Sequence, residues 1–368
     1  MSFYIHQRDN WTDFTWDESI LSVPLGTVRN LQGRLTGKME MLGFALQQES
    51  LLETLTLDVL KSTEIEGEFL NIAQVRSSLA KRLGMDIGSL IPTDRNVDGM
   101  VEMMLDATQN SQNLLTQERL FNWHAALFPT GRSGIYPIIT GEWRTNIMQV
   151  VSGGLGGEKV HFQAPDADSV NQEMAKFFYW FNENQNIDPV LKAGIAHFWF
   201  ITIHPFDDGN GRIARAITDM QLSKADGNTQ RFFSMSAQIQ KKRSGYYEIL
   251  EKSQKGSSNI TFWLDWFLEC LTEALQNADT VLEKVLSKAR FWENHRLTLL
   301  NQRQHLMLNK LLDNFEGKLT SSKWAKITKC SSDTALRDMQ DLMSKGILKK
   351  EDSGGRNTNY ELIFSIIK

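Results

Sequence analysis

The residues that could do chemistry are most concentrated between His204 and Arg215, where the sequence is HPFDDGNGRIAR. His204 is the side chain of this stretch that can exchange a proton near neutral pH. Asp208 offers a hard carboxylate oxygen, the kind of ligand that Mg²⁺ prefers when it also holds nucleotide phosphates. Arg212 and Arg215 lie three residues apart on a predicted helix, so both guanidinium groups can reach one anion. The stretch therefore predicts a phosphate site for a Mg²⁺-nucleotide with a general base beside it.

Two predicted helices position these residues. The apolar stretch 191–203 predicts a buried helix that ends at His204, and 212–224 predicts the next helix. The start of a helix has N–H groups without helical partners and the positive end of the helix dipole, which together favour an anion. Gly209 and Gly211 flank this start, and glycine lets the backbone approach a ligand closely. The alternative is a plain helical corner with surface arginines and a capping histidine, but so many functional residue types in one stretch favour the phosphate site.

The same twelve residues resemble, position for position, the signature of the Fic family, His-Pro-Phe-x-Asp/Glu-Gly-Asn-Gly-Arg-x-x-Arg. The resemblance implies a mainly α-helical fold and transfer of AMP from ATP to a Ser, Thr or Tyr hydroxyl (AMPylation) of a target protein or of the protein itself. It implies that His204 is the catalytic base and Asp208 the Mg²⁺ ligand. It also implies that Phe206 fixes the loop from the core. The nucleotide-site residues that the resemblance implies are Phe206, Gly209, Asn210, Gly211, Arg212, Arg215 and Glu66.

A second motif lies at Ser62, Glu66 and Gly67, in a stretch with helical spacing of its apolar residues. Ser62 and Glu66 lie four residues apart on one helix face, and Gly67 is a plausible helix stop. Alone, an acidic helix end is typical of solvated surface. The resemblance implies more, because inhibited Fic proteins carry Ser/Thr-x-x-x-Glu-Gly/Asn, and their Glu pairs with the second signature arginine, here Arg215. An arginine neutralised by a carboxylate cannot also hold a phosphate.

A β-hairpin is predicted between residues 140 and 165. Ile147–Val151 and Val160–Phe162 are β-branched or apolar, and Gly153–Gly157 forms a glycine-rich turn between them. No Gly-Lys-Ser/Thr helix start follows the glycines, which argues against a Walker-type phosphate loop. The hairpin resembles the "flap" of Fic proteins, which implies that it aligns a target segment by strand pairing.

Composition and charge describe an ordinary globular protein of 368 residues with a formal net charge of −4. Two cysteines and no apparent signal peptide or membrane span lead us to expect a cytoplasmic protein without membrane contact. We expect three domains: residues 1–85, helical with the inhibitory helix; residues 86–290, the Fic catalytic core with its β-hairpin flap; and residues 291–368, a winged-helix-like domain.

The sequence also permits other functions. The same site could remove AMP, with Glu66 positioning a water molecule. Residues 295–368 carry 13 Lys or Arg and 8 Asp or Glu, a formal charge of +5 that permits DNA binding by a regulator or sensor. Asp338 and Asp341 on the predicted recognition helix argue against tight insertion into DNA, and a protein contact or a homodimer is favoured over DNA. We expect ATP and Mg²⁺ as substrate and cofactor.

Overall fold

The structure is a computed structural model that describes residues 4–87, 90–152, 159–183, 186–226, 231–313, 315, 317–351 and 359–363. It is 65% helical, which confirms the predicted mainly α-helical fold. The chain divides into two compact units, Met1–Leu282 and Glu283–Lys368. Among the described residues, no helix is both long and apolar enough to cross a bilayer.

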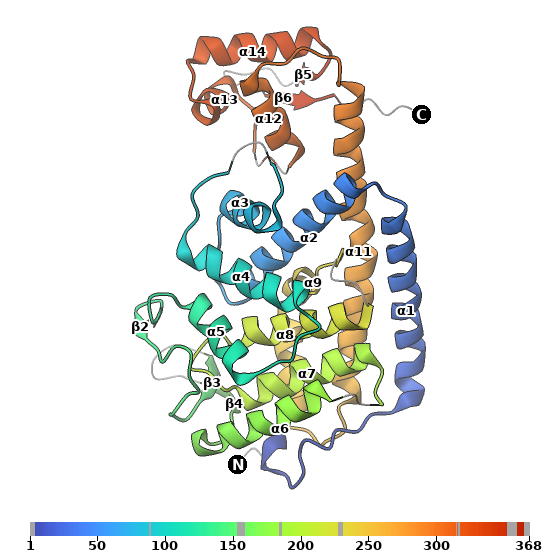
Figure 1. The fold of residues 1–368 in the computed structure, drawn as a ribbon, viewed down its shortest axis with the longest axis vertical. Helices are drawn as coiled ribbons and strands as arrows, with labels where there is room; N and C mark the ends of the chain where they lie inside the picture. Colours follow the sequence, from blue (N-terminus) through green and yellow to red (C-terminus); the bar gives the residue numbers. More distant parts are fainter. Residues whose placement is uncertain are drawn as a thin grey trace. The chain divides into compact units, whose positions relative to one another are not determined.

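The first unit is built from helices with small strand pairs at one side (Figure 1). Its helices are α1 Glu18–Glu40, α2 Phe44–Ile65, α3 Ile72–Leu83, α4 Arg95–Gln109, α5 Gln117–Leu127, α6 Val170–Asn182, α7 Pro189–Ile203, α8 Asn210–Asp226, α9 Met235–Lys241, α10 Arg243–Gln254 and α11 Thr261–Asn294, which continues into the second unit. Short 3₁₀ helices cover Ile5–Gln7 and Ala167–Ser169, and the strands are β1 Arg132–Ser133, β2 Tyr136–Pro137, β3 Gln149–Ser152 and β4 Lys159–Gln163.

Helix α7 is the centre of the first unit. All of its residues from Val190 to Ile203 are buried, as expected for a helix that is apolar on every side. Asp188 caps its first turn by accepting from the backbone N–H of Val190 at 2.8 Å, and Pro189 follows at a position that needs no N–H donor. Helix α8 packs along α7, which confirms both helices predicted around the signature.

Helix α2 brings the second motif to α8. Its side chains from Ser50 to Ile65 are largely buried, and it packs on α9 as well as on α8. The buried carboxylate of Asp58 accepts hydrogen bonds from the Ser234 hydroxyl at 2.5 Å and the Ser236 N–H at 3.2 Å, at the start of α9. This buried polar contact fixes α2 two turns before the predicted inhibitory residues.

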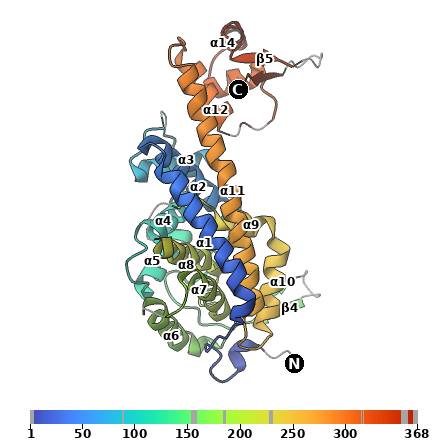
Figure 2. The ribbon, with the colours of Figure 1, turned by 90° about the vertical axis from the view of Figure 1, so that its right-hand side faces the viewer.

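Helices α1 and α11 are the two longest described helices. Helix α1 contains three glycines and Pro24, and Asp17 caps it by accepting from the N–H of Ser19. Helix α11 is continuous from Thr261 to Asn294, since residues 275–294 contain neither glycine nor proline and keep an apolar face. Figure 2 shows α1 running beside α11, where Lys38 and Asp279 form an ion pair of 2.7 Å.

The predicted hairpin is present as the antiparallel pair β3–β4. Gln149 lies opposite Gln163 and Ser152 opposite Lys159, with one irregular step at Val150 and Val151. Phe162 is buried against the ring of Tyr4, which holds β4 on the body of the unit. The glycine turn predicted at 153–157 lies outside the described residues.

The second unit consists of three short helices and a strand pair. They are α12 Gln302–Leu312, α13 Ser321–Thr328, α14 Ser332–Ser344, β5 Leu348–Lys350 and β6 Tyr360–Leu362. Their apolar residues surround the fully buried Trp324. Helix α12 begins at Gln302, because Asn301 starts it with a capping box to Gln304. The three domain boundaries remain predictions.

Candidate active site

His204 ends α7 in a left-handed backbone conformation, with φ 52° and ψ 59°. Such a conformation costs energy in a residue other than glycine and persists only where the surroundings impose it. The backbone N–H of His204 donates to the Phe200 carbonyl at 3.0 Å, and its carbonyl accepts from Nε of Arg144 at 2.8 Å. The backbone N–H of Arg144 donates to the Pro205 carbonyl at 2.9 Å. Arg144 therefore fixes the start of the signature loop.

The imidazole of His204 is arranged to act as a base. Its Nδ1 lies 3.3 Å from the carbonyl oxygen of Ile201, which can only accept, so Nδ1 carries the proton and Nε2 keeps a lone pair. Burial lowers the pKa of His204 to about 4, so the ring is neutral at pH 7. A neutral imidazole with a free Nε2 is competent to take a proton from a hydroxyl group.

The loop after His204 is braced from inside. Phe206 is fully buried, and its ring stacks on that of His124 with centroids 4.2 Å apart. The side chain of Asn210 accepts from the N–H of Phe206 at 3.0 Å and donates to its carbonyl at 2.8 Å. These bonds use the Asn210 amide within the loop, so it is the Asn210 backbone, and not its side chain, that remains for an anion.

Asp208 is partly open to solvent, with 41% of its side-chain surface accessible. One carboxylate oxygen accepts from the Ser133 hydroxyl and the other accepts from the N–H of Gly209 at 2.5 Å. His124 accepts at Nδ1 from the N–H of Gly141, so its Nε2 donates to the Asp208 carbonyl at 3.2 Å. The Asp208 side chain is thus oriented but remains open to a ligand.

The two glycines at the start of α8 each have a close neighbour where a Cβ would lie. Gly209 has φ 81°, and a Cβ there would lie 2.9 Å from the ring of Phe128. A Cβ on Gly211 would lie 2.2 Å from Oε1 of Glu66. The first N–H groups of α8 point to this place without helical partners. The Glu66 carboxylate therefore lies at the N-terminus of α8, where the sequence predicted a phosphate site.

Arg215 is held by both residues of the second motif. Its side chain is only 2% exposed, and NH2 donates to Oε1 of Glu66 at 2.8 Å. Its Nε donates to the Ser62 hydroxyl at 2.8 Å, and NH2 also donates to the Ser62 carbonyl at 2.7 Å. Gly67 follows with φ 83°, as expected for the residue that stops the helix. The predicted pair of Glu66 and Arg215 is therefore present in the structure.

Arg212 has a carboxylate partner that the sequence reasoning missed. Its NH1 donates to Oε2 of Glu68 at 2.8 Å, and its guanidinium carbon lies 4.9 Å from the centre of the Phe128 ring. Arg212 and Arg215 lie on one face of α8 as predicted, and each is occupied by a glutamate from residues 66–68. Ser133, His124 and Arg144 were also missed, because they reach the signature from 60 or more residues upstream in a way that no local pattern reveals.

The oxygen ligands of the site fit Mg²⁺ only as an ion that is bound together with a nucleotide. Among the described residues there is no group of three or more His, Cys, Asp or Glu side chains that could hold a metal alone. Mg²⁺ is commonly bound by one or two carboxylates together with substrate phosphates and water. Asp208 supplies one such carboxylate beside the start of α8, so the site fits an ion that arrives with a nucleotide.

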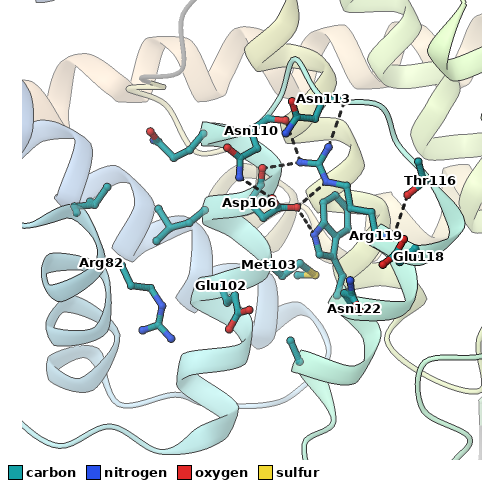
Figure 3. Close-up of a pocket in the computed structure, with 15 residues that line it drawn as sticks. Arg82, Glu102, Met103, Asp106, Asn110, Asn113, Thr116, Glu118, Arg119 and Asn122 are labelled. Atoms are coloured by element: carbon teal, nitrogen blue, oxygen red, sulfur yellow. Dashed lines mark hydrogen bonds and ion pairs between the residues drawn. The ribbon is translucent and has the colours of Figure 1, made fainter.

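A separate cavity of about 890 Å³ lies between α4 and α5 (Figure 3). Arg119, which lines it, is held by hydrogen bonds: it donates to the Asp106 carboxylate at 2.6 Å and to carbonyls at the end of α4. Trp123 donates to the same carboxylate at 2.7 Å. No signature residue lines this cavity, and its polar groups cap α4, so it is not the nucleotide site.

Comparison with known proteins gives two family matches and several relatives. Residues 114–222 match the Fic/DOC family, and residues 4–85 match a domain of unknown function, DUF4172. Proteins named protein adenylyltransferase Fic are 28% identical over 218 residues (Drosophila mojavensis) and 29% identical over 220 residues (Culex quinquefasciatus). Each match covers 58% of this chain, and the chain spans 39% of the length of each relative.

Solved structures show the same fold at low sequence identity. A Fic family protein from Desulfovibrio desulfuricans G20 aligns over 95% of this chain and 97% of its own, with a TM-score of 0.54 and 20% identity. A Fic domain containing signaling protein from Bacteroides thetaiotaomicron aligns over 70% of this chain and 98% of its own, with a TM-score of 0.52 and 19% identity. The complete signature, the helical fold and these matches agree: residues 114–222 of this chain form a Fic/DOC family domain.

Proposed function

We propose that this protein is an adenylyltransferase that moves AMP from ATP to a Ser, Thr or Tyr hydroxyl of a target protein or of itself. The observation that carries the proposal is the neutral, oriented imidazole of His204 at the end of α7, followed within one loop by the glycine-flanked start of α8. The relatives named protein adenylyltransferase Fic support the same class of reaction at the level of the family.

In the proposed reaction, Nε2 of His204 takes the proton of the target hydroxyl. The hydroxyl oxygen then forms a bond to the α-phosphorus of ATP, the bond from that phosphorus to the bridging oxygen breaks, and pyrophosphate leaves. Arg212 and Arg215 would hold the outer phosphates by charge-assisted hydrogen bonds, and the first N–H groups of α8 would hold phosphate oxygens. Mg²⁺, carried by Asp208 and the phosphates, would reduce the negative charge of the leaving group.

The proposal includes self-inhibition by Glu66. Its carboxylate lies at the predicted phosphate position and neutralises Arg215, so a phosphate placed there would meet a like charge and lose its cation. The alternative is removal of AMP from a modified protein at the same site. A water molecule oriented by the Glu66 carboxylate would form a bond to the AMP phosphorus, the bond from that phosphorus to the target oxygen would break, and AMP would leave.

No observation favours DNA binding by the second unit. The face of α14 is neutral: Asp333 and Arg337 are its exposed charges among the described side chains, while Asp338 is buried in a pair with Arg303 and Asp341 pairs with Lys345. A helix that reads DNA needs an excess of positive charge on its exposed face. The predicted winged-helix-like domain therefore remains a proposal for protein contacts, including a homodimer.

Labelling with ATP tests the reaction type. The purified Glu66→Gly variant, with Mg²⁺ and a cell lysate as a source of targets, is incubated with ATP that carries ³²P at either the α or the γ position. The proposal predicts protein labelling from the α position only. Labelling from the γ position would show phosphate transfer and would contradict the proposed reaction.

A further inference from the structure

The segment that ends α2 places two carboxylates, not one, on the signature arginines. Glu66 contacts Arg215, and Glu68 contacts Arg212 at 2.8 Å. The side chain of Arg212 is 4% exposed, so this guanidinium is a buried cation, whereas that of Glu68 is 48% exposed. Glu68 therefore reaches the buried guanidinium group of Arg212 from the solvent side.

The backbone holds Glu68 as firmly as it holds Glu66. The N–H of Glu68 donates to the Thr63 carbonyl at 3.1 Å, and the N–H of Gly67 donates to the Glu64 carbonyl at 3.0 Å. This is the Schellman pattern of a helix end, and it needs a left-handed residue, which Gly67 supplies with φ 83°. Gly67 thus does more than stop the helix, because the turn it makes points Glu68 back toward α8.

The charges around Arg212 show what this contact does. Besides Glu68, the guanidinium group meets the Phe128 ring and, at 3.9 Å, Oδ1 of Asp208. Its buried Nε has no hydrogen-bond partner among the described residues. Arg212 and Arg215 together contact three carboxylates, those of Glu66, Glu68 and Asp208. If one glutamate leaves, the two remaining carboxylates still balance both arginines, so a triphosphate meets no net positive charge at this site.

We propose that Glu68 is a second inhibitory carboxylate, which keeps Arg212 from the phosphates as Glu66 keeps Arg215. This inference rests on the proposed function, because it assigns a regulation to the same phosphate site. It means that removal of Glu66 alone opens only half of the site. Full opening requires the 66–68 segment to move as one piece, which its shared helix-end hydrogen bonds favour.

Nucleotide binding tests the inference without any transfer step. The affinity for a non-hydrolysable ATP analogue with Mg²⁺ is measured by calorimetry for the wild type, Glu68→Gln, Glu66→Gln and the double variant. Since Glu68 is half exposed and Arg212 is buried, we expect Glu68→Gln to tighten binding about 3- to 10-fold, and to do so again in the Glu66→Gln background. The neutral amide keeps the size of the side chain, so folding is retained, and thermal melting checks this.

Glu64→Gln is the matched control. Glu64 lies in the same helix end and carries the same charge, but it pairs with Lys61 rather than with a signature arginine. If Glu68→Gln changes the affinity no more than Glu64→Gln does, in both backgrounds, the inference is wrong. That result would leave the proposed AMP transfer intact, because a Glu66→Gly protein that labels from α-³²P ATP needs no contribution from Glu68.

Discussion

Arg144 fixes the start of the signature loop, and the substitution Arg144→Lys tests this role. The side chain is 2% exposed and donates to four backbone carbonyls: those of His204 at 2.8 Å, Asn146 at 2.8 Å, Pro165 at 2.6 Å and Ile203 at 3.4 Å. A guanidinium group presents five donors in a planar fork, whereas the lysine ammonium presents three donors at a single point. Lysine can therefore reach one or two of these carbonyls but not all.

The expected loss of stability follows from the backbone carbonyls that lose their hydrogen-bond donor. Each buried acceptor that loses its partner costs about 1–3 kcal/mol, so two lost partners predict that the free energy of unfolding falls by about 2–6 kcal/mol. The hydrogen bond from Arg144 to the His204 carbonyl also helps to hold the strained backbone of His204. We therefore expect the rate of AMP transfer by Arg144→Lys in the Glu66→Gly background to fall at least about tenfold, because the base is misplaced.

Urea unfolding measures the first effect and labelling at saturating ATP the second. Arg132→Lys is the control, because Arg132 is exposed and its side chain donates at 3.0 Å to the carbonyl of Ile135 in an open turn. A loss of less than about 0.5 kcal/mol in Arg144→Lys, the level typical of surface substitutions, would refute the role given to Arg144.

Two further outcomes are expected. Burial lowers the pKa values of His124 and His204 to about 4 and that of His197 to about 3, so the unfolded chain, with histidine pKa values near 6.5, binds more protons than the folded protein below that pH. The free energy of unfolding should fall by about 3–5 kcal/mol between pH 6.5 and pH 5 in urea titrations, and a flat profile would contradict this. Gly209→Ala should lower the melting temperature and the affinity for ATP, because alanine at φ 81° is strained and its Cβ meets the Phe128 ring; unchanged melting would show that the loop adapts.

Much of the central geometry could be predicted from the sequence because it is local. The apolar run before His204 and the glycines after it specify α7, the loop and α8 within one stretch, and helical spacing alone places Arg212 and Arg215 on one face. The pair of Glu66 and Arg215 joins residues 149 positions apart, and no spacing rule predicts it. Only the resemblance to Fic proteins made that pair an expectation.

The contacts of Glu68 and Arg144 could not be predicted from the sequence for the same physical reason. Glu68 reaches Arg212 only because Gly67 turns the chain, and a two-residue offset on a continued helix would have pointed it elsewhere. Arg144 looked like one charge in a predicted hairpin region, yet its role depends on the carbonyls exposed where α7 ends. Such contacts are set by tertiary packing, which a single sequence does not reveal.

The most direct test of the central claim compares three proteins with α-³²P ATP and Mg²⁺: the wild type, Glu66→Gly and Glu66→Gly with His204→Ala. Calorimetry with the ATP analogue checks that the last variant still binds nucleotide. We predict weak labelling in the wild type, labelling increased at least about tenfold when Glu66 is removed, and none when His204 is also removed. Equal labelling with and without His204 would contradict the assignment of the base, and no labelling in any of the three would contradict AMP transfer itself.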